Sequence, residues 1–214
     1  MYMKRFVFFL MLFAVSTAQI FSQKIGIFYN TNVWADFTYL TTVSSKIENE
    51  YKSDLNVIDY CSQTLQKNFT EIEVIDMNPS NMINIKSKTK NLCTEGNFDY
   101  AIVLVHTSPG PDLAADKIRY KMGSKSFGLV AHSMNKKVYY VFFNTVFMLY
   151  SKKSDKFIHF DVENYKTYEW FKEQENIIED GKLTQKALND GISLIKKKLD
   201  SNLNPIITAI KNGD

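Results

Sequence analysis

A serine, an aspartate and a histidine follow one another in an order that could support acyl transfer. Ser133 comes directly after an extended apolar run, and Asp155 and His159 follow it along the chain. In a serine hydrolase the histidine removes the proton of the serine hydroxyl, and the acid orients the histidine. Ser133, Asp155 and His159 are therefore the candidate catalytic residues of one interpretation, in which the protein is a small serine hydrolase.

The residues around Ser133 resemble, in part, the nucleophile elbow of the α/β-hydrolases. Residues 129–135 read L-V-A-H-S-M-N, and residues 105–110, V-H-T-S-P-G, are similar to the oxyanion loop of that family. The elbow needs glycines two positions on either side of the serine, where this chain has Ala131 and Asn135. It also needs a helix after the serine, whereas residues 136–141 have the composition of a strand. A hairpin turn explains the same residues.

No metal or cofactor is predicted from the other reactive side chains. The three histidines, His106, His132 and His159, are far apart in the sequence. The chain has none of the closely spaced pairs of histidines or cysteines that are typical of a zinc site. The eight glycines form no phosphate-binding loop. We expect neither a metal site nor a bound nucleotide cofactor.

Polar and aromatic residues follow two of the predicted strands and form a candidate ligand-binding site. In open α/β sheets, ligands bind beyond the carboxyl ends of parallel strands. The residues expected at that edge are Asn30, Asn32, Trp34, His106 and Asp112. The structural alternative is a set of turns with one tryptophan in the core.

Residues 1–22 have the three-part order of a secretory signal peptide. Lys4 and Arg5 precede an apolar stretch from 6 to 15, and small residues follow at Ser16 and Ala18. These predict cleavage after residue 18, or alternatively after Ser22, and a single globular αβ domain over 23–214. The sequence near the cut contains no cysteine that could carry a lipid. We expect an exported protein, periplasmic or extracellular, with no transmembrane span in the mature chain.

The charge balance of the mature chain argues against a nucleic-acid partner. Removal of residues 1–22 leaves 24 basic and 23 acidic side chains, a net charge of +1. Nucleic-acid binding depends on basic surfaces that neutralise phosphates. Arg119 is the one arginine left, so bidentate recognition of phosphate must be rare.

Two cysteines, Cys61 and Cys93, would meet an oxidising compartment after export. A disulfide between them is therefore possible. Cys61 also falls on the apolar face of a predicted helix, where a free thiol acts as a small hydrophobic side chain. Both alternatives stay open.

Periodicity predicts alternating strands and helices in the first half of the chain. Residues 24–29, 71–76 and 98–106 are extended, and the last is apolar enough to be central in a sheet. Apolar residues recur every three or four positions over 47–69, which predicts one helix, or two divided at residues 53–54. A second helix is expected near 81–92.

The second half predicts a β-meander followed by a long helix. Residues 127–132 and 137–150 are expected to form a hairpin of long strands, and 151–155 to turn into 156–160. The helical pattern returns from Tyr165, and an apolar stripe over 188–210 ends the chain, with Pro205 expected to kink or break it. The fold class is thus α/β (α+β): one mixed sheet of about five or six strands covered by helices, with a β-meander before a long C-terminal helix.

This order of elements resembles the αβ accessory domains of the bacterial cell envelope. That group includes the amino-terminal domain of TolB, the curli secretion factor CsgG and the penicillin-binding-protein activator LpoB. The matching strands are 24–28, 72–76 and 98–103. The resemblance implies an exported, non-catalytic binding or accessory protein whose partner is another exported or envelope protein. The serine hydrolase built on Ser133 is the alternative.

Overall fold

The computed structural model describes residues 23–40, 47–77, 84–107, 125–132, 138–160, 178–180 and 182–214, so the predicted signal peptide lies outside the described residues. The elements are, in chain order, β1 (Lys24–Asn30), β2 (Trp34–Leu40), β3 (Ile47–Asn56), α2 (Val57–Gln66), β4 (Glu71–Asp76), α3 (Ile85–Glu95), β5 (Tyr100–His106), β6 (Phe127–His132), β7 (Val138–Phe143), β8 (Thr145–Ser151), β9 (Lys156–Phe160), β10 (Ile178–Glu179), β11 (Lys182–Leu183) and α5 (Gln185–Asn212). This mixture of helices and mixed sheets confirms the predicted fold class.

A five-stranded sheet forms one half of the molecule, in the order β4-β1-β5-β8-β9. β1 pairs in parallel with β4 and with β5, and β8 pairs antiparallel with β5 and β9. The early strands are thus parallel and the later ones antiparallel, as the sequence predicts. β5, the most apolar strand of this sheet, lies at its centre and pairs with β1 on one side and β8 on the other.

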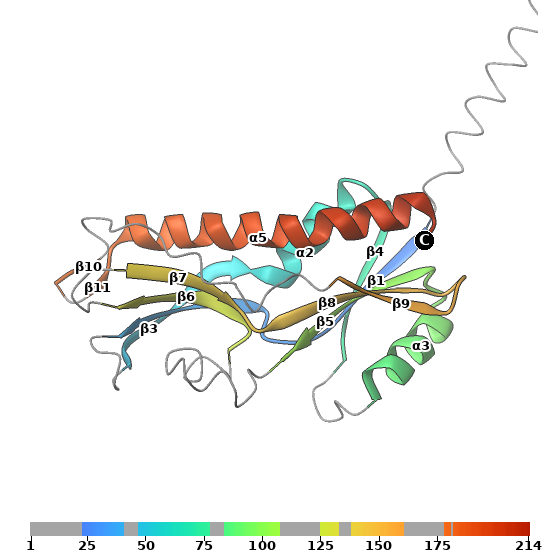
Figure 1. Ribbon diagram of the computed structural model, residues 1–214, viewed down its shortest axis with the longest axis horizontal. Helices are drawn as coiled ribbons and strands as arrows, with labels where there is room; N and C mark the ends of the chain where they lie inside the picture. The colour runs from blue at the N-terminus through green and yellow to red at the C-terminus, as the bar shows by residue number, and fades with distance from the viewer. Residues whose placement is uncertain are drawn as a thin grey trace, which may run out of the picture.

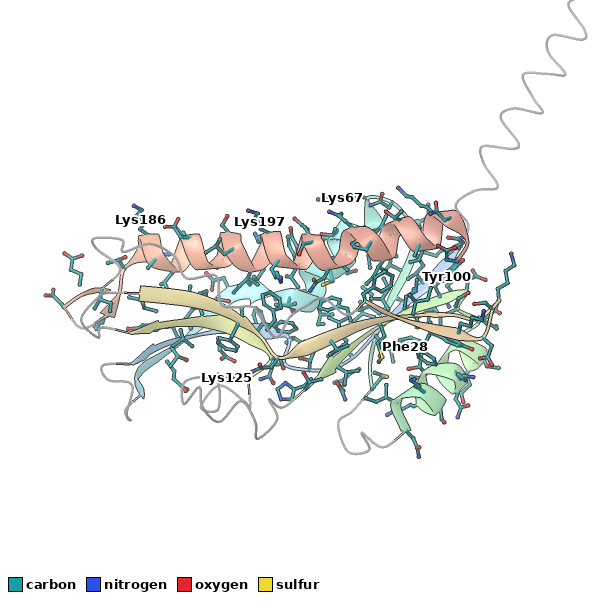
Figure 2. The ribbon with its side chains drawn as sticks, in the orientation of Figure 1. Phe28, Lys67, Tyr100, Lys125, Lys186 and Lys197 are labelled. Carbon is teal, nitrogen blue, oxygen red and sulfur yellow. The ribbon has the colours of Figure 1, made fainter. Side chains whose placement is uncertain are left out.

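The two faces of this sheet bury different clusters of side chains. Ile25, Ile102 and Leu149 belong to a cluster shared with α2 and α5, whereas Phe28 and Val103 belong to a second cluster that includes Cys93 of α3. Because side chains alternate along a strand, the clusters lie on opposite faces. Figure 2 shows Tyr100 and Phe28 on these two sides. The sheet is therefore a central layer between helices.

A second, four-stranded sheet was not predicted. Its order is β3-β2-β6-β7, with β2 parallel to β6 and the other neighbours antiparallel. β10 and β11 form a separate two-stranded ribbon. The prediction of a single sheet of five or six strands is therefore wrong in this respect, since the strands divide between two mixed sheets that lie end to end (Figure 1).

The long strand predicted over 137–150 divides at Asn144. Its first part, β7, belongs to the four-stranded sheet and its second part, β8, to the five-stranded sheet. The backbone N–H of Asn144 donates to the carbonyl of Ser126 at 2.7 Å, and its side-chain Nδ2 donates to the carbonyl of Lys125 at 2.8 Å. Asn144 thus marks the point at which one apolar run passes from one sheet to the next.

The predicted helix over 47–69 is wrong in its first half, which forms β3. Positions four apart share a face in a strand as well as in a helix, so the spacing of Ile47, Tyr51 and Leu55 fits both. α2 begins at Val57, where the Asn56 side chain accepts hydrogen bonds from the N–H groups of Ile58 and Asp59. The pairing of β3 with β2 shows that this first half is a strand and not a helix.

The C-terminal helix α5 runs without a break through Pro205, so of the two predicted alternatives, a kink or a break, the break does not occur. It contains 28 residues and is the longest of the described helices. Figure 1 shows α5 lying along both sheets, and Figure 2 shows Lys186 and Lys197 on its outer side. The helix predicted from Tyr165 falls on 161–177, outside the described residues.

One cluster under α5 joins the two halves. Phe37 and Leu129 of the four-stranded sheet belong to the same cluster as Ile25 and Leu149 of the other. Gly191 lets α5 come close, because a Cβ there would lie 2.5 Å from Leu129 Cδ1 and 2.9 Å from Phe37 Cε1. None of the helices that the structure describes combines the length and apolar character needed to cross a bilayer.

Candidate functional site

Polar side chains gather where the two sheets meet, at the carboxyl ends of the parallel strands β1 and β5. The chain leaves β1 at Asn30 and β5 at His106, and it enters β6 and β8 at the same place. We call this group the polar junction; its residues are Asn30, Thr31, Asn32, His106, Thr107, Ser126, Asn144 and Thr145. It includes three of the five residues predicted for a strand-end site.

Ser126 is the centre of the polar junction. Its Oγ lies 3.1 Å from Nδ1 of His106 and accepts a hydrogen bond from the backbone N–H of Asn32 at 3.1 Å. Its carbonyl accepts from the Asn144 N–H and from Thr145 Oγ1, the latter at 3.4 Å. One serine therefore contacts the ends of β1, β5 and β7 and the start of β8.

Further hydrogen bonds hold the strand ends to one another. The His106 N–H donates to Asn30 Oδ1 at 3.1 Å, and the Thr107 N–H donates to the carbonyl of Asn144 at 2.9 Å. Thr31 Oγ1 and Thr145 Oγ1 lie 3.3 Å apart. The predicted residues Asn30, Asn32 and His106 are thus brought together, each as part of a structural network.

The contact between Ser126 and His106 has the residue types of a nucleophile and its base. However, Ser126 is only 1% exposed, and its oxygen already accepts from Asn32. A substrate could not reach this hydroxyl without separation of the two sheets. In this fold the second sheet begins at the edge where an open α/β sheet binds a ligand, and Ser126 and His106 join the two sheets there.

Trp34 lies beside the polar junction, where it begins β2. It is 43% exposed, and the neighbouring Asn32 is also exposed. Val33 is held by a 2.7 Å hydrogen bond from the Val57 N–H to its carbonyl. The alternative of a core tryptophan is therefore wrong for Trp34. Asp112, the fifth predicted residue, lies outside the described residues.

Lys125 adds a charged group next to Ser126. Its Nζ lies 3.0 Å from Glu50 Oε1 and 3.9 Å from Asp36 Oδ1, and its side chain is 14% exposed. These contacts tie the start of β6 to β2 and β3. The cation is neutralised within the four-stranded sheet, so it serves the packing of the sheet near the junction.

Of the alternative catalytic triad, the structure describes Asp155 and His159, which both lie at the β8–β9 hairpin of the five-stranded sheet. Ser133 lies outside the described residues, and His132 before it ends β6 in the four-stranded sheet. Asp155 lies in the turn between β8 and β9, at the far end of the other sheet (Figure 1). Its carboxylate accepts from the Tyr150 hydroxyl at 2.9 Å and pairs with Lys90 at 2.6 Å. His159 lies on β9, where its Cα partner is Met148 of β8.

Both cysteines are free, so the disulfide that the sequence left open does not form. Cys61 lies in the cluster under α5 and Cys93 in the cluster on the α3 side, with the five-stranded sheet between them. Burial raises the pKa of each thiol to about 12. Both thiols are thus protonated at neutral pH and act as hydrophobic side chains.

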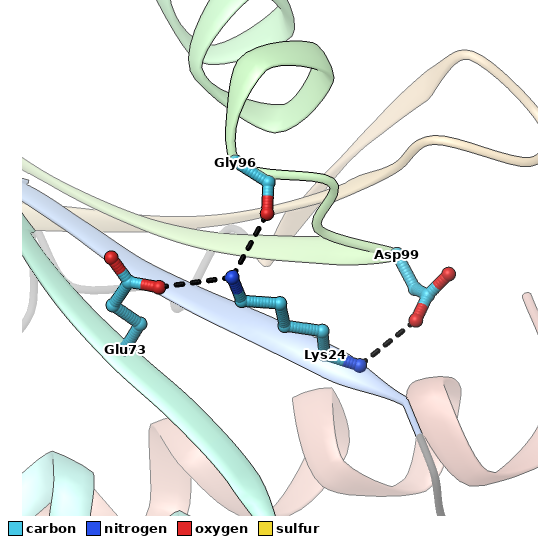
Figure 3. Close-up of polar contacts among 4 residues, drawn as sticks. All are labelled: Lys24, Glu73, Gly96 and Asp99. Atoms are coloured by element: carbon cyan, nitrogen blue, oxygen red, sulfur yellow. Dashed lines mark hydrogen bonds and ion pairs between the residues drawn. The ribbon is translucent and has the colours of Figure 1, made fainter.

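A second polar cluster fixes the other end of β1 (Figure 3). The Lys24 ammonium lies 3.1 Å from Glu73 Oε2 and donates to the Gly96 carbonyl at 2.9 Å. The Lys24 N–H donates to Asp99 Oδ2, and the Asp99 N–H donates back to the Lys24 carbonyl, both at 2.8 Å. The first strand is thereby fastened at its first residue, immediately after the predicted cleavage region.

Sequence reasoning missed Ser126, Asn144 and Thr145. The signal for the last two is visible, because Asn144 and Thr145 interrupt an apolar run that otherwise continues from 138 to 150. Two adjacent polar residues within such a run indicate a change of environment. Ser126 carries no comparable local signal, since its role depends on four strands that are distant in sequence.

The described residues contain no group of three or more His, Cys, Asp or Glu side chains that could hold a metal ion. The polar junction is therefore best described as a structural network that is buried at Ser126, Asn144 and Thr145 and exposed at Asn32, with Trp34 exposed beside it. Comparison of the chain with protein-family models, with curated proteins and with solved structures found no match.

Proposed function

We propose that the protein is an exported, non-catalytic accessory protein of the cell envelope, which binds another exported or envelope protein through the surface around Trp34. The observation that carries this proposal is the exposure of Trp34 beside a hydrogen-bonded junction that holds two sheets together. Tryptophan is among the residues most enriched at the energetic centres of protein interfaces. A rigid support lowers the entropy that such a side chain loses on binding.

The use of the strand ends also favours a binding role over catalysis. Ser126 and His106, the pair with the right chemistry for acyl transfer, hold the two sheets together. Asp155 of the alternative triad is engaged by Tyr150 and Lys90. These polar residues thus have structural partners, whereas Trp34 offers apolar surface to a second protein.

The test compares the two large hydrophobic side chains that are most exposed among the described residues, Trp34 and Val74. Cross-linking in the native envelope should capture a specific protein with the wild type and with Val74→Ala, which is a matched control because Val74 is 41% exposed on β4. Trp34→Ala should lose it. Capture by the wild type and both variants alike, or by none of them, would reject Trp34 as the contact.

Two further measurements separate this proposal from the alternatives. Labelling by a fluorophosphonate probe that disappears in Ser133→Ala would establish the serine hydrolase. Mass spectrometry of the mature amino terminus should find Gln19 or Gln23 as the first residue. An intact Met1 in the envelope fraction would contradict export by a cleaved signal peptide.

A further inference from the structure

The outer side of α5 carries charge of one sign. All the exposed charged residues of this helix are lysines: Lys186, Lys197 and Lys211. Its two acidic residues, Asp190 and Asp200, are half-buried, and Asp200 accepts a hydrogen bond from the Tyr60 hydroxyl. At its exposed positions α5 therefore presents only positive charge to the solvent.

The three exposed lysines lie in one line along the helix. Lys186 and Lys197 are eleven positions apart, and Lys197 and Lys211 are fourteen apart, which is close to three and four turns. The line is roughly 37 Å long, at about 1.5 Å per residue. Lys67, exposed at the end of α2, lies beside it, because the neighbouring Asn68 accepts a 2.8 Å hydrogen bond from Lys211 Nζ. Figure 2 shows Lys67, Lys186 and Lys197 along the same side of the molecule.

The lysines on this side differ from those of α3 in their partners. On α3, Lys90 pairs with Asp155 at 2.6 Å. The ammonium groups of Lys67, Lys186 and Lys197 make no hydrogen bond or ion pair with any residue in the described part of the chain. A line of cations that no internal acid neutralises attracts anions from outside the protein.

We propose that the outer side of α5 is a membrane-docking surface, which binds the anionic headgroups of a lipid bilayer through Lys67, Lys186, Lys197 and Lys211. Lysines beside an anionic bilayer are attracted by charge alone. Nucleic-acid recognition favours arginine, whose planar fork pairs with phosphate, and α5 contains no arginine. A straight line of single charges instead suits a flat surface. The inference rests on the proposed function in one respect, that an envelope protein has a membrane beside it.

The proposed contact is peripheral and electrostatic. α5 buries its apolar stripe, which includes Ile195 and Leu199, in the cluster that it shares with the sheets. Apart from Pro205, the exposed positions between the lysines are polar, as at Ser193 and Asn204. Helices that insert into a bilayer bury an apolar face in it, and α5 has none to offer. Salt should therefore weaken the binding strongly.

Co-sedimentation with vesicles tests the proposal on the full chain, expressed with its amino-terminal segment so that the host processes it. The wild type should bind vesicles that contain phosphatidylglycerol and should not bind vesicles of phosphatidylcholine alone. Raising the salt from about 0.1 M to about 1 M shortens the Debye length from about 10 Å to about 3 Å and should release the protein. Equal binding to both kinds of vesicle, no binding to either, or binding that survives the salt would overturn the proposal.

A pair of matched double variants locates the contact. Lys186→Gln combined with Lys197→Gln should weaken binding to the anionic vesicles at least about tenfold. Both positions are exposed and glutamine is a good helix former, so this variant should fold. Lys153→Gln combined with Lys156→Gln removes the same charge at the turn between β8 and β9, and should bind like the wild type. Equal binding by the two double variants would overturn the proposal.

Two further measurements separate this surface from other partners. Trp34→Ala should bind the anionic vesicles like the wild type, so that failure of membrane binding and failure of the contact at Trp34 are distinguishable. Loss of vesicle binding in Trp34→Ala would place the membrane contact elsewhere than on α5. Tighter binding of a DNA duplex than of the vesicles, lost when Lys186 and Lys197 are replaced, would assign this surface to nucleic acid and overturn the proposal.

Discussion

The five-stranded and four-stranded sheets bury their strands in different ways. β1 and β5 of the first sheet contribute residues to two clusters, one on each face, and both strands are almost entirely apolar. β2 and β3 of the second sheet carry Asp36 and Glu50, which pair with Lys125. A short apolar run bounded by turn residues favours a strand buried on both faces, whereas a strand with charged positions shares its pattern with an amphipathic helix.

The two sheets nevertheless share one helix and one cluster. α5 covers both, and the cluster beneath it includes Phe37 and Ile195 as well as Ile25. The polar junction adds hydrogen bonds between the sheets at Ser126. The comparison therefore teaches that the halves differ in composition but should unfold as one unit.

The largest expected effect comes from truncation of one buried phenylalanine in each half. Phe28→Ala and Phe37→Ala should each lower the free energy of unfolding by about 3–5 kcal/mol, because each removes a fully buried ring. Urea unfolding followed by circular dichroism and by tryptophan fluorescence should give a single transition in both variants. Two separate transitions in Phe37→Ala would show that the four-stranded half unfolds independently.

Gly191→Val tests the close approach of α5 to the four-stranded sheet. The new side chain would overlap Leu129 and Phe37, which are both buried, so the free energy of unfolding should fall by about 1–3 kcal/mol. Ser193→Val is the control on the exposed side of the same helix and should cost only a few tenths of a kcal/mol. Equal effects of the two substitutions would mean that α5 does not pack tightly at Gly191.

Ser126→Ala tests the link between the sheets at the polar junction. The substitution removes the acceptor of the Asn32 N–H and one contact of the His106 ring, so a loss of about 1–3 kcal/mol in the free energy of unfolding is expected. Ser154→Ala, in the exposed turn before β9, is the control. It should change the free energy of unfolding by only a few tenths of a kcal/mol. Thermal unfolding of the two variants side by side measures the difference in their stability. Equal stability of the two variants would contradict a structural role for Ser126.

The smallest effect is expected at the contact between α2 and α5. The Tyr60 hydroxyl donates to Asp200 at 2.9 Å. Loss of this hydrogen bond in Tyr60→Phe should lower the free energy of unfolding by roughly 1 kcal/mol at neutral pH. Desolvation and the Asp200 carboxylate raise the pKa of Tyr60 to about 12.

The raised pKa of Tyr60 makes this contribution depend on pH. It is complete below pH 10, the usual pKa of tyrosine, and is lost as the pH rises towards 12. Urea titrations at several pH values should show the deficit of Tyr60→Phe shrinking over that window. A deficit that stays constant with pH would contradict the hydrogen bond to Asp200.

The local sequence pattern was sufficient to predict the strands of the five-stranded half and insufficient to predict all the strands of the other half. The apolar runs of β1 and β5 and the acid alternation of β4 correctly predicted strands. Ile47, Tyr51 and Leu55 were assigned to a helix because residues four apart share a face in both structures. Only the pairing of β3 with β2 distinguishes them, and that pairing joins residues on separate parts of the chain.

The sequence predicted three residues that meet at the candidate site, but it did not predict their role in joining the two sheets. Asn30, Asn32 and His106 do meet at the ends of parallel strands, as the general rule for α/β sheets implies. The sequence could not show that Ser126 and the second sheet would meet these strand ends, because the division of one apolar run at Asn144 depends on which strands accept its two parts.

Four features can be predicted from the residues alone: the class of fold, the central strand β5, the parallel start and antiparallel end of the main sheet, and the long amphipathic helix at the carboxyl terminus. These follow from residue spacing, which acts over one element at a time. Contacts between distant segments decide that there are two sheets, that α5 continues through Pro205 and that Ser126 joins the strand ends of the two sheets. Each of these outcomes depends on contacts between distant segments, and local periodicity carries no information about them.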